Sequence, residues 1–215
     1  MSISSLRLIF RKIWMDRLNS TIKIVGLAVG MTCALWATLF IRDENSFDKF
    51  HEKADRLYRI TTTIDNPQDG GRSIMGATGQ VQGPAFKDKI PEIQDYARVM
   101  GGLGTNFIAN EKPLYLNYIY ADESFFDIFS FPLVYGKPSS ALKALHSVVI
   151  TEQTAIKCFG ARDVVGRTIK LEEGHGTASF MITGVAKDVP IHSSIQFEAV
   201  LPFRYLQTMP SKHLK

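Results

Sequence analysis

The longest apolar stretch of the chain lies near its amino end. Residues 24–41, IVGLAVGMTCALWATLFI, contain no charged side chain. At about 1.5 Å rise per residue, this run with Ile22 and the aliphatic stem of Lys23 spans a hydrocarbon core of roughly 30 Å. The competing interpretation is a cleaved signal peptide, but such peptides have shorter apolar cores and an Ala-x-Ala site, which is missing here. The pattern therefore predicts a transmembrane helix over residues 22–42.

A second periodic pattern precedes this span. In residues 4–18, SSLRLIFRKIWMDRL, apolar side chains fall on one helical face and basic side chains fall elsewhere, which predicts a cytoplasmic amphipathic interfacial helix within residues 1–21. This helix is either a lead-in to the anchor or an elbow that transmits force from a cytosolic partner. The side chains expected at the membrane interface are Arg7, Arg11, Lys12, Trp14, Arg17 and Trp36.

Beyond the span, helical and strand periodicities alternate. Residues 43–215 therefore read as a mixed α+β domain, and the fold class is α+β with an N-terminal amphipathic helix and one transmembrane helix. Strands are expected at 56–64, 93–100, 105–109, 114–120, 148–151, 167–172, 179–186 and 195–201. Helices are expected at 80–90, 123–129 and 152–159, with Gly160 as the C-terminal cap of the last one. The stretch 65–83, rich in polar and glycine residues, reads as a loop.

Charge gives the orientation of the span. Five basic residues and one acidic residue lie in residues 1–23, while Asp43, Glu44 and Asp48 follow the span. By the positive-inside rule the N-terminus is cytoplasmic and the main domain is periplasmic, in a cell inner membrane. The leading segment accounts for the whole formal charge of +4, so the outer domain has no basic face for nucleic acid. Membrane lipid is the partner that the basic leader favours.

Small side chains recur every fourth residue within the span. Gly26, Gly30 and Ala34 share one helical face and would let a second transmembrane helix approach closely. Because glycine is common in membrane helices, the stripe alone leaves both interpretations open.

The sequence shows no pattern typical of a catalytic or metal site. The five histidines are scattered without ligand spacing, Cys33 lies in the span and Cys158 in the domain. Glu172, Glu173 and His175 read as solvated residues of a turn, so no metal or cofactor is expected. Gly101, Gly102 and Gly104 form a glycine-rich turn without the lysine of a phosphate loop. We therefore expect that the chain is not an enzyme.

Several phrases of the sequence, taken in order, resemble MacB/FtsX-type ABC transporter permeases. The first is the basic leader followed by GLAVG at 26–30, DENSFDKFH at 43–51 and ADRLYR at 54–59. The later ones are YADESFFDIFSFP at 120–132, SVVITE at 147–152 with Phe159-Gly160, GRTI at 166–169, ITGVAKDVP at 182–190 and SIQF at 194–197. The likeness covers nearly the whole chain and identifies residues 43–215 as similar to the MacB-like periplasmic core domain.

The resemblance implies a non-catalytic permease subunit that works with a cytosolic ABC ATP-binding subunit and with a second permease copy or half. ATPase-driven motion would be transmitted across the membrane to the periplasmic domain. Members of the family return to the membrane through three further helices that this sequence does not contain, so we expect an N-terminal portion with an incomplete periplasmic domain. The alternative from the residues alone is a single-pass membrane-anchored sensor or ligand-binding ectodomain. An anchored enzyme ranks last.

Overall fold

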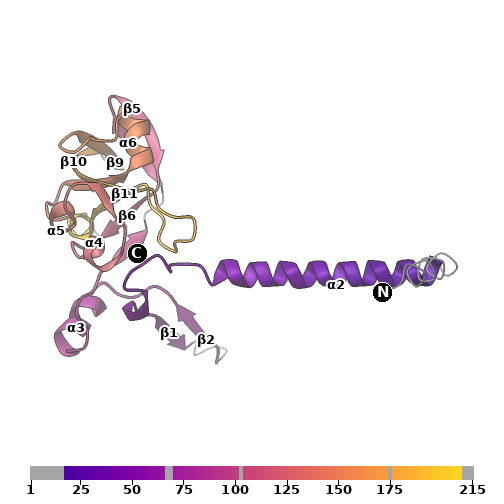
Figure 1. The fold of residues 1–215 in the computed structure, drawn as a ribbon. Coiled ribbons are helices and arrows are strands. Elements are labelled where there is room, and N and C mark those ends of the chain that lie inside the picture. The colour runs from indigo at the N-terminus through magenta and orange to yellow at the C-terminus, as the bar shows by residue number, and fades with distance from the viewer. Residues whose placement is uncertain (1–16, 66–69, 102–103, 174–175, 210–215) are drawn as a thin grey trace. The chain divides into compact units, whose positions relative to one another are not determined.

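The computed structural model in Figure 1 describes residues 17–65, 70–101, 104–173 and 176–209. The chain divides at the Phe47–Asp48 bond into two units with separate internal contacts. The expected interfacial helix within residues 1–21 falls almost entirely outside the described residues and stays a prediction.

The first unit is dominated by one helix, α2, which runs from Arg17 to Glu44 over 28 residues. None of these residues is buried, and the helix is long and apolar enough to cross a membrane. Two of its threonine hydroxyls donate to carbonyl oxygens of the preceding turn, Thr32 to Ala28 and Thr38 to Ala34, both at 2.8 Å. These two polar groups within the apolar part of the helix are therefore paired inside the helix itself.

The second unit is built on a large mixed sheet. In the described residues, nine strands join in the order β3-β6-β11-β8-β10-β9-β4-β5, and β7 pairs with β10 on a side branch. The pairs β10–β8 and β11–β6 are parallel, and the others are antiparallel. The strand bounds are β3 Val99–Gly101, β4 Thr105–Ala109, β5 Lys112–Leu116, β6 Tyr118–Ala121, β7 Leu133–Tyr135, β8 Ser147–Thr151, β9 Thr168–Glu173, β10 Gly176–Ala186 and β11 Ala199–Pro202.

The sheet is covered on both faces at its centre. Strand β8 is buried at every position; Val148 and Ile150 join one hydrophobic cluster, and Val149 joins the other. Helices α6 (Glu152–Phe159) and α7 (Phe203–Leu206) contribute to the first cluster, while α4 (Phe125–Ile128) and α5 (Pro138–Ala141) contribute to the second. A strand buried on both faces reads as a continuous apolar run, which explains the sequence SVVIT.

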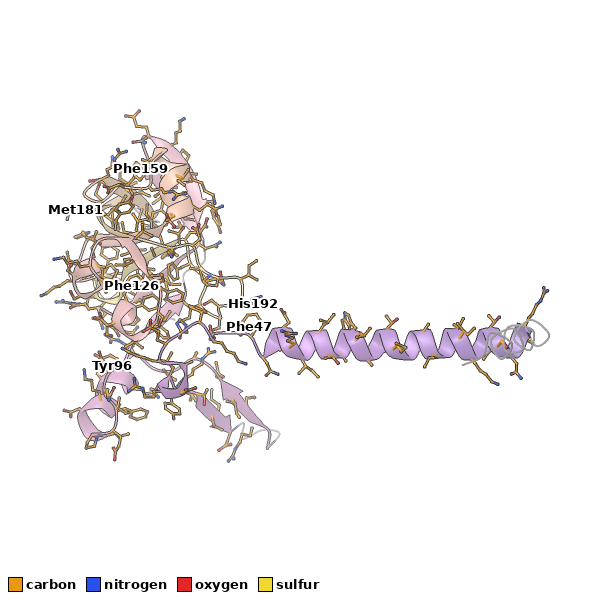
Figure 2. The ribbon with its side chains drawn as sticks, viewed as in Figure 1. Phe47, Tyr96, Phe126, Phe159, Met181 and His192 are labelled. Carbon is orange, nitrogen blue, oxygen red and sulfur yellow. The ribbon has the colours of Figure 1, made fainter. Side chains whose placement is uncertain are left out.

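The second cluster is unusually aromatic. Phe125 is fully buried and its ring stacks on that of Phe131, with centroids 5.5 Å apart and planes 12° apart. Phe126, Phe129 and Phe197 surround this pair at centroid distances of 5.0 to 6.0 Å. Phe126 is labelled in Figure 2. Phe50, in the segment that follows Phe47, packs against this cluster.

A smaller part of the second unit precedes the sheet. It contains a 3₁₀ turn at Ala54–Arg56, a hairpin of β1 (Thr62–Asp65) and β2 (Arg72–Met75), and helix α3 (Gln82–Lys89). The hairpin pairs Thr62 with Met75 and Asp65 with Arg72, and its residues are largely exposed.

Local signals in the sequence located several elements well. The strand at 105–109 and the helix at 152–159 have the predicted bounds, and Gly160 ends the helix with φ of 69°. The predicted hairpin of 167–172 and 179–186 is formed by β9 and β10. The helices expected at 80–90 and 123–129 correspond to α3 and the shorter α4.

Other predictions were wrong in extent. The strand expected at 56–64 is confined to Thr62–Asp65, since only these residues face β2, and β2 itself lies within the predicted loop 65–83. The strand expected at 114–120 is two strands, because Asn117 leaves the ladder to bond Glu198. The strands expected at 93–100 and 195–201 begin only at Val99 and Ala199. Three short elements, β7, α5 and α7, were not predicted.

Neighbouring residues of β10 provide a test of this core. Phe180 is fully buried and Met181, on the opposite face, is 49% exposed. Phe180→Ala is expected to lower the free energy of unfolding by about 3–5 kcal/mol, because it removes a ring that packs on Tyr205. Met181→Ala is expected to change it by less than about 0.5 kcal/mol. Chemical denaturation of the full chain in detergent, followed by near-UV circular dichroism, measures both; equal effects would contradict the assignment of the two faces.

Candidate functional site

The residues that follow the first unit are fixed to the domain by hydrogen bonds. The backbone N–H of Asp48 donates to the carbonyl oxygen of His192 at 2.9 Å, and the backbone N–H of Ser194 donates to Asp48 Oδ1 at 2.9 Å. Asp48 has a positive φ of 57°, a conformation that aspartate tolerates better than most residues. We call residues 48–53 the anchor segment.

His51 is the centre of the anchor segment. Its side chain is buried, with 4% of the residue exposed, and its ring lies 4.0 Å from that of Phe50, 5.3 Å from Phe129 and 5.2 Å from Phe131. The backbone N–H of Ser130 donates to His51 Nδ1 at 3.1 Å. An Nδ1 that accepts a hydrogen bond assigns the proton of the neutral ring to Nε2, which lies 4.0 Å from Asp48 Oδ1.

The pKa of His51 reflects this position. Burial lowers the pKa of the imidazole below its ordinary value, and the nearby carboxylate of Asp48 raises it to a smaller degree. The net direction is downward, so the ring is held in its neutral form. A neutral ring keeps the Nδ1 lone pair that the Ser130 N–H requires.

Two further bonds complete the attachment. The backbone N–H of Glu52 donates to Ser130 Oγ at 2.9 Å, and the Lys53 ammonium donates to the carbonyl oxygen of Asp127 at 2.6 Å. The anchor segment is thus held by two stretches that are far away in sequence, residues 127–130 and 192–194. Asp48–His51, Ser130 and Ser194 belong to three separate sequence motifs that resemble those of the permeases, and the structure brings these three motifs together.

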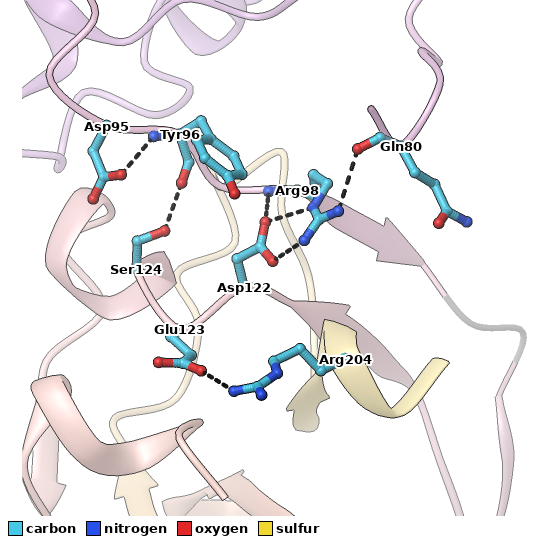
Figure 3. Close-up of polar contacts among 8 residues, drawn as sticks. All are labelled: Gln80, Asp95, Tyr96, Arg98, Asp122, Glu123, Ser124 and Arg204. Carbon is cyan, nitrogen blue, oxygen red and sulfur yellow. Dashed lines mark hydrogen bonds and ion pairs between the residues drawn. The ribbon is translucent and has the colours of Figure 1, made fainter. Parts of the chain in front are cut away.

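A second polar junction lies at the start of the sheet (Figure 3). The Arg98 guanidinium donates to both carboxylate oxygens of Asp122, from Nε to Oδ2 at 2.8 Å and from Nη2 to Oδ1 at 2.7 Å. The backbone N–H of Arg98 also donates to Asp122 Oδ2. The two side chains are only 19% and 11% exposed. This is a bidentate pair shielded from water, the strongest geometry that an arginine and a carboxylate form.

The same arginine links three parts of the domain. Its Nη1 donates to the carbonyl oxygen of Gln80 before α3, and its guanidinium lies 4.3 Å from the ring centroid of Phe203 in α7. The hydrogen bond with Asp122 raises the pKa of Arg98 above its ordinary value, so the guanidinium stays charged. Ser124 Oγ donates to the carbonyl oxygen of Tyr96 nearby. Residues 80–98 are therefore attached to the sheet through charge rather than through a shared core.

Surface hollows in the described part of the domain include two that lie beside charged side chains. One, of about 400 Å³, lies beside Arg98, and the other, of about 330 Å³, lies beside Glu198. Arg98 is already bound by Asp122 and Gln80, and Glu198 is bound by Asn117 and Lys157 at 3.0 and 3.2 Å. The Arg98 and Glu198 side chains thus interact with the protein itself, and Asp88 is a further charged residue that lines the hollow beside Arg98.

The site residues named from the sequence lie on or before α2. Gly26, Gly30 and Ala34 are exposed on this helix, and a Cβ placed on either glycine would meet no atom within 4 Å. Trp36 is 70% exposed and its ring stacks on Phe40 with centroids 5.9 Å apart. Arg17 is the first residue of the helix. Arg7, Arg11, Lys12 and Trp14 lie outside the described residues, so their interfacial role stays a prediction, as does the packing role of the small residues.

Sequence reasoning missed the roles of His51, Arg98 and Asp122. His51 was counted among scattered histidines, and the arginine and aspartate belonged to no motif. The available signal was the resemblance itself, because its phrases include both Asp48–His51 and Asp122.

Comparison with known proteins agrees with this architecture. In the described residues, a helix long and apolar enough to cross a membrane is joined to a mixed α+β domain. The chain matches the family model of the MacB-like periplasmic core domain over residues 20–214, and it belongs to this family. No curated protein sequence matches the chain.

Solved structures include similar domains. A domain assigned to a permease protein of Porphyromonas gingivalis is similar with a TM-score of 0.54 and 29% identity, over 62% of this chain and 59% of that chain. The periplasmic region of MacB from Actinobacillus actinomycetemcomitans has a TM-score of 0.42 and 17% identity, over 53% and 50% of the two chains. The extracellular domain of the noncanonic ABC-type transporter YknZ from Gram-positive bacteria has 0.40 and 18%, over 51% and 56%. The matches thus span half to three fifths of the solved chains.

The lowered pKa of His51 predicts a pH dependence of stability. The unfolded state binds this proton at the ordinary pKa of 6.5 and the folded state only at a lower pH, so the unfolded chain holds more protons between the two values. The contribution is therefore complete above pH 6.5 and is lost as the pH falls through the folded-state pKa. Denaturation midpoints measured from pH 8 to pH 5 should fall less steeply in His51→Gln than in the parent chain.

Adjacent carboxylates separate the buried ion pair from an exposed one. Asp122→Ala leaves Arg98 unpaired among apolar groups and should cost about 3 kcal/mol of unfolding free energy. Glu123→Ala removes a 2.8 Å pair with Arg204 whose side chains are 43% and 62% exposed, and should cost less than about 1 kcal/mol. Urea denaturation of both variants tests the ranking; a cost at Glu123 as large as that at Asp122 would refute it.

Proposed function

We propose that this chain supplies the first membrane helix and the periplasmic domain of an ABC transporter permease subunit. Its role is mechanical: motion driven by a cytosolic ATP-binding subunit reaches α2, and the anchor segment passes it to the domain. Membership in the MacB-like family supports the permease assignment. Because the chain spans 59% of the similar P. gingivalis chain, the activity of a whole transporter is part of the proposal.

The anchor segment is the observation that carries this function. The chain stays coiled after α2, since Asn45 N–H donates to Ile41 O at 3.0 Å and Ser46 N–H to Asp43 O at 2.9 Å. Asp48, four residues after the end of the helix, is already hydrogen-bonded to the domain. A short coiled connection followed at once by a buried attachment transmits displacement better than a flexible linker would, because little chain entropy can absorb the movement.

The proposed topology follows from the charge pattern. The N-terminus is cytoplasmic, α2 crosses the cell inner membrane and residues 43–215 are periplasmic. The face of Gly26, Gly30 and Ala34 would contact a second permease copy or another membrane helix, since it is open in the described structure. The interfacial side chains from Arg7 to Arg17 would bind lipid headgroups.

Cysteine chemistry supports a non-catalytic role. Burial raises the pKa of the Cys158 thiol to about 11, so very little thiolate exists at neutral pH and the group is a poor nucleophile. Among the described residues no group of three or more His, Cys, Asp or Glu could hold a metal ion. Membership in the MacB-like family supports a separate ATP-binding subunit as the energy source of the proposed transporter.

Lengthening the connection tests the mechanical role. In the assembled permease with its ATP-binding subunit, a Gly-Gly-Ser insertion between Phe47 and Asp48 should abolish the difference in domain position between nucleotide-free and ATP-bound states. A spin label on Tyr115→Cys, at the exposed edge strand β5, in a background lacking Cys33 and Cys158, reports that difference. ATP hydrolysis should continue, because the insertion lies outside the ATP-binding subunit.

The same insertion between Asn110 and Glu111 is the matched control. These two residues form the turn between β4 and β5, both with positive φ, 48° and 63°, and an insertion at this turn should leave the nucleotide response intact. An unaltered response with the Phe47–Asp48 insertion would rule out transmission through the anchor segment.

Alkaline phosphatase fused after Arg42 should be active, and inactivity would refute the periplasmic location.

A further inference from the structure

The hydrogen bond that attaches His51 to the domain can form in only one charge state of its ring. Nδ1 accepts from the Ser130 backbone N–H at 3.1 Å, and an accepting nitrogen must keep its lone pair. A proton added at Nδ1 turns this nitrogen into a donor that faces a second donor. One proton therefore replaces an attraction with a repulsion and leaves the Ser130 N–H without its partner in the folded domain.

The surroundings of the ring give little support to a positive charge. Three phenylalanine rings enclose it at centroid distances of 4.0 to 5.3 Å: Phe50, Phe129 and Phe131. The charged group that acts on the ring is the Asp48 carboxylate, whose Oδ1 lies 4.0 Å from Nε2, too far for a hydrogen bond. This oxygen already accepts from the Ser194 N–H. Burial therefore outweighs the carboxylate, and the pKa of His51 is lowered.

Other titratable residues on the elements that pack around the ring lie farther toward solvent. The anchor segment carries Lys49, Glu52 and Lys53, and the stretch 127–130 carries Asp127; all four are exposed, so water and salt screen their charges. The Lys53 ammonium is directed to the carbonyl oxygen of Asp127. In the turn at 190–193, His192 contacts the anchor segment through its carbonyl oxygen, which accepts from the Asp48 N–H.

The core beneath the anchor segment is assembled from other elements. The second hydrophobic cluster is formed by side chains of β6, β8, β11, α4 and α5 together with Phe131 and Phe197, and Phe50 only packs against it as a partly buried residue. The Arg98–Asp122 pair holds residues 80–98 to the sheet through a separate contact. Detachment of residues 48–53 would thus expose two rings and leave the sheet in place. Segments with few buried contacts open locally in this way, without unfolding of the whole domain.

We propose that protonation of His51 releases the anchor segment, residues 48–53, from the domain while the sheet stays folded. In the released state the imidazolium is hydrated and the Ser130 N–H bonds to water, so both conflicts of the protonated attached state are removed. Attachment is strongest above pH 6.5, the ordinary pKa of the ring, and weakens as the pH falls toward the lower pKa of the attached state. One consequence rests on the proposed function: acidification outside the membrane would loosen the connection that passes motion from α2 to the domain.

Hydrogen exchange of the full chain in lipid nanodiscs, measured by mass spectrometry between pH 8 and pH 5, tests the release. Rates are divided by the intrinsic exchange rate at each pH. Protection of peptides that cover residues 48–53 and 127–131 should then fall by up to about 30-fold over this range, the ratio for a group that binds one proton at 6.5 once released. The peptide that contains β8, a strand buried at every position, should keep its protection.

Two variants separate the acceptor from the ring. His51→Asn places a carbonyl oxygen, bonded to Cγ as Nδ1 is, where it can accept from the Ser130 N–H, and His51→Phe keeps an aromatic ring without an acceptor. Neither side chain titrates. Protection of residues 48–53 should therefore be independent of pH in both variants, at a level that reports how much each feature contributes to the attachment.

The other results would overturn the inference. Constant protection of residues 48–53 in the parent chain from pH 8 to pH 5 would show that the proton does not release them. A parallel loss in the β8 peptide would show unfolding of the whole domain instead. A pH dependence that persists in either His51 variant, or that disappears in His192→Gln, would assign the proton to another group. The nucleotide response of the Tyr115→Cys spin label at pH 8 tests the proposed function separately: its absence would refute transmission, while the exchange data still decide whether the anchor segment is released.

Discussion

The proposed function of this protein depends on how one histidine is buried. His51 enters a cluster of phenylalanine rings that also forms the core between the sheet and helices α4 and α5. Its Nδ1 satisfies a backbone N–H that would otherwise be orphaned under those rings. The ring is therefore apolar cover and hydrogen-bond acceptor at once, and neither phenylalanine nor a charged side chain could replace both roles. Because His51 follows α2 by seven residues, the aromatic core holds the chain almost as soon as it leaves the helix.

The two polar junctions of the domain differ in what they permit. The anchor segment is embedded in the hydrophobic core. Pulling it out exposes aromatic surface to water, and the free-energy cost rises with the area exposed. The Arg98–Asp122 pair is the charged contact among those that join residues 80–98 to the sheet, and its bidentate geometry is directional. A load applied at Asp48 would therefore move the sheet as a body. The part that contains α3 and the hairpin of β1 and β2 is joined to the sheet by directional polar contacts, which favours a move between separate positions relative to the sheet.

The sequence predicted those elements whose signals are local. Capping residues mark both ends of helix α6 in the sequence: Thr151 Oγ1 accepts from the Thr154 N–H at its start, and Gly160 takes the left-handed conformation at its end. Residues 93–98 carry the alternation of a strand, but their positions are set by side chains distant in sequence, since Arg98 is bound to Asp122 and Tyr96 to Ser124. The anchor was beyond reach for the same reason: His51 and Ser130 are 79 residues apart. The resemblance to permeases identified the relevant phrases, and only the fold showed that they meet.

The two units differ in how their apolar side chains are buried. No residue of α2 is buried although the helix is apolar, so its apolar surface would be removed from water only by lipid or another helix. The domain buries its own core and is electrically balanced, because the leader accounts for the net charge of +4. An exposed apolar helix is thus joined by a few coiled residues to a unit with its own hydrophobic core. Under the proposed function, forces on the first unit would reach the second through the backbone between Glu44 and His51, so the stiffness of that segment would determine how much of the movement the domain receives.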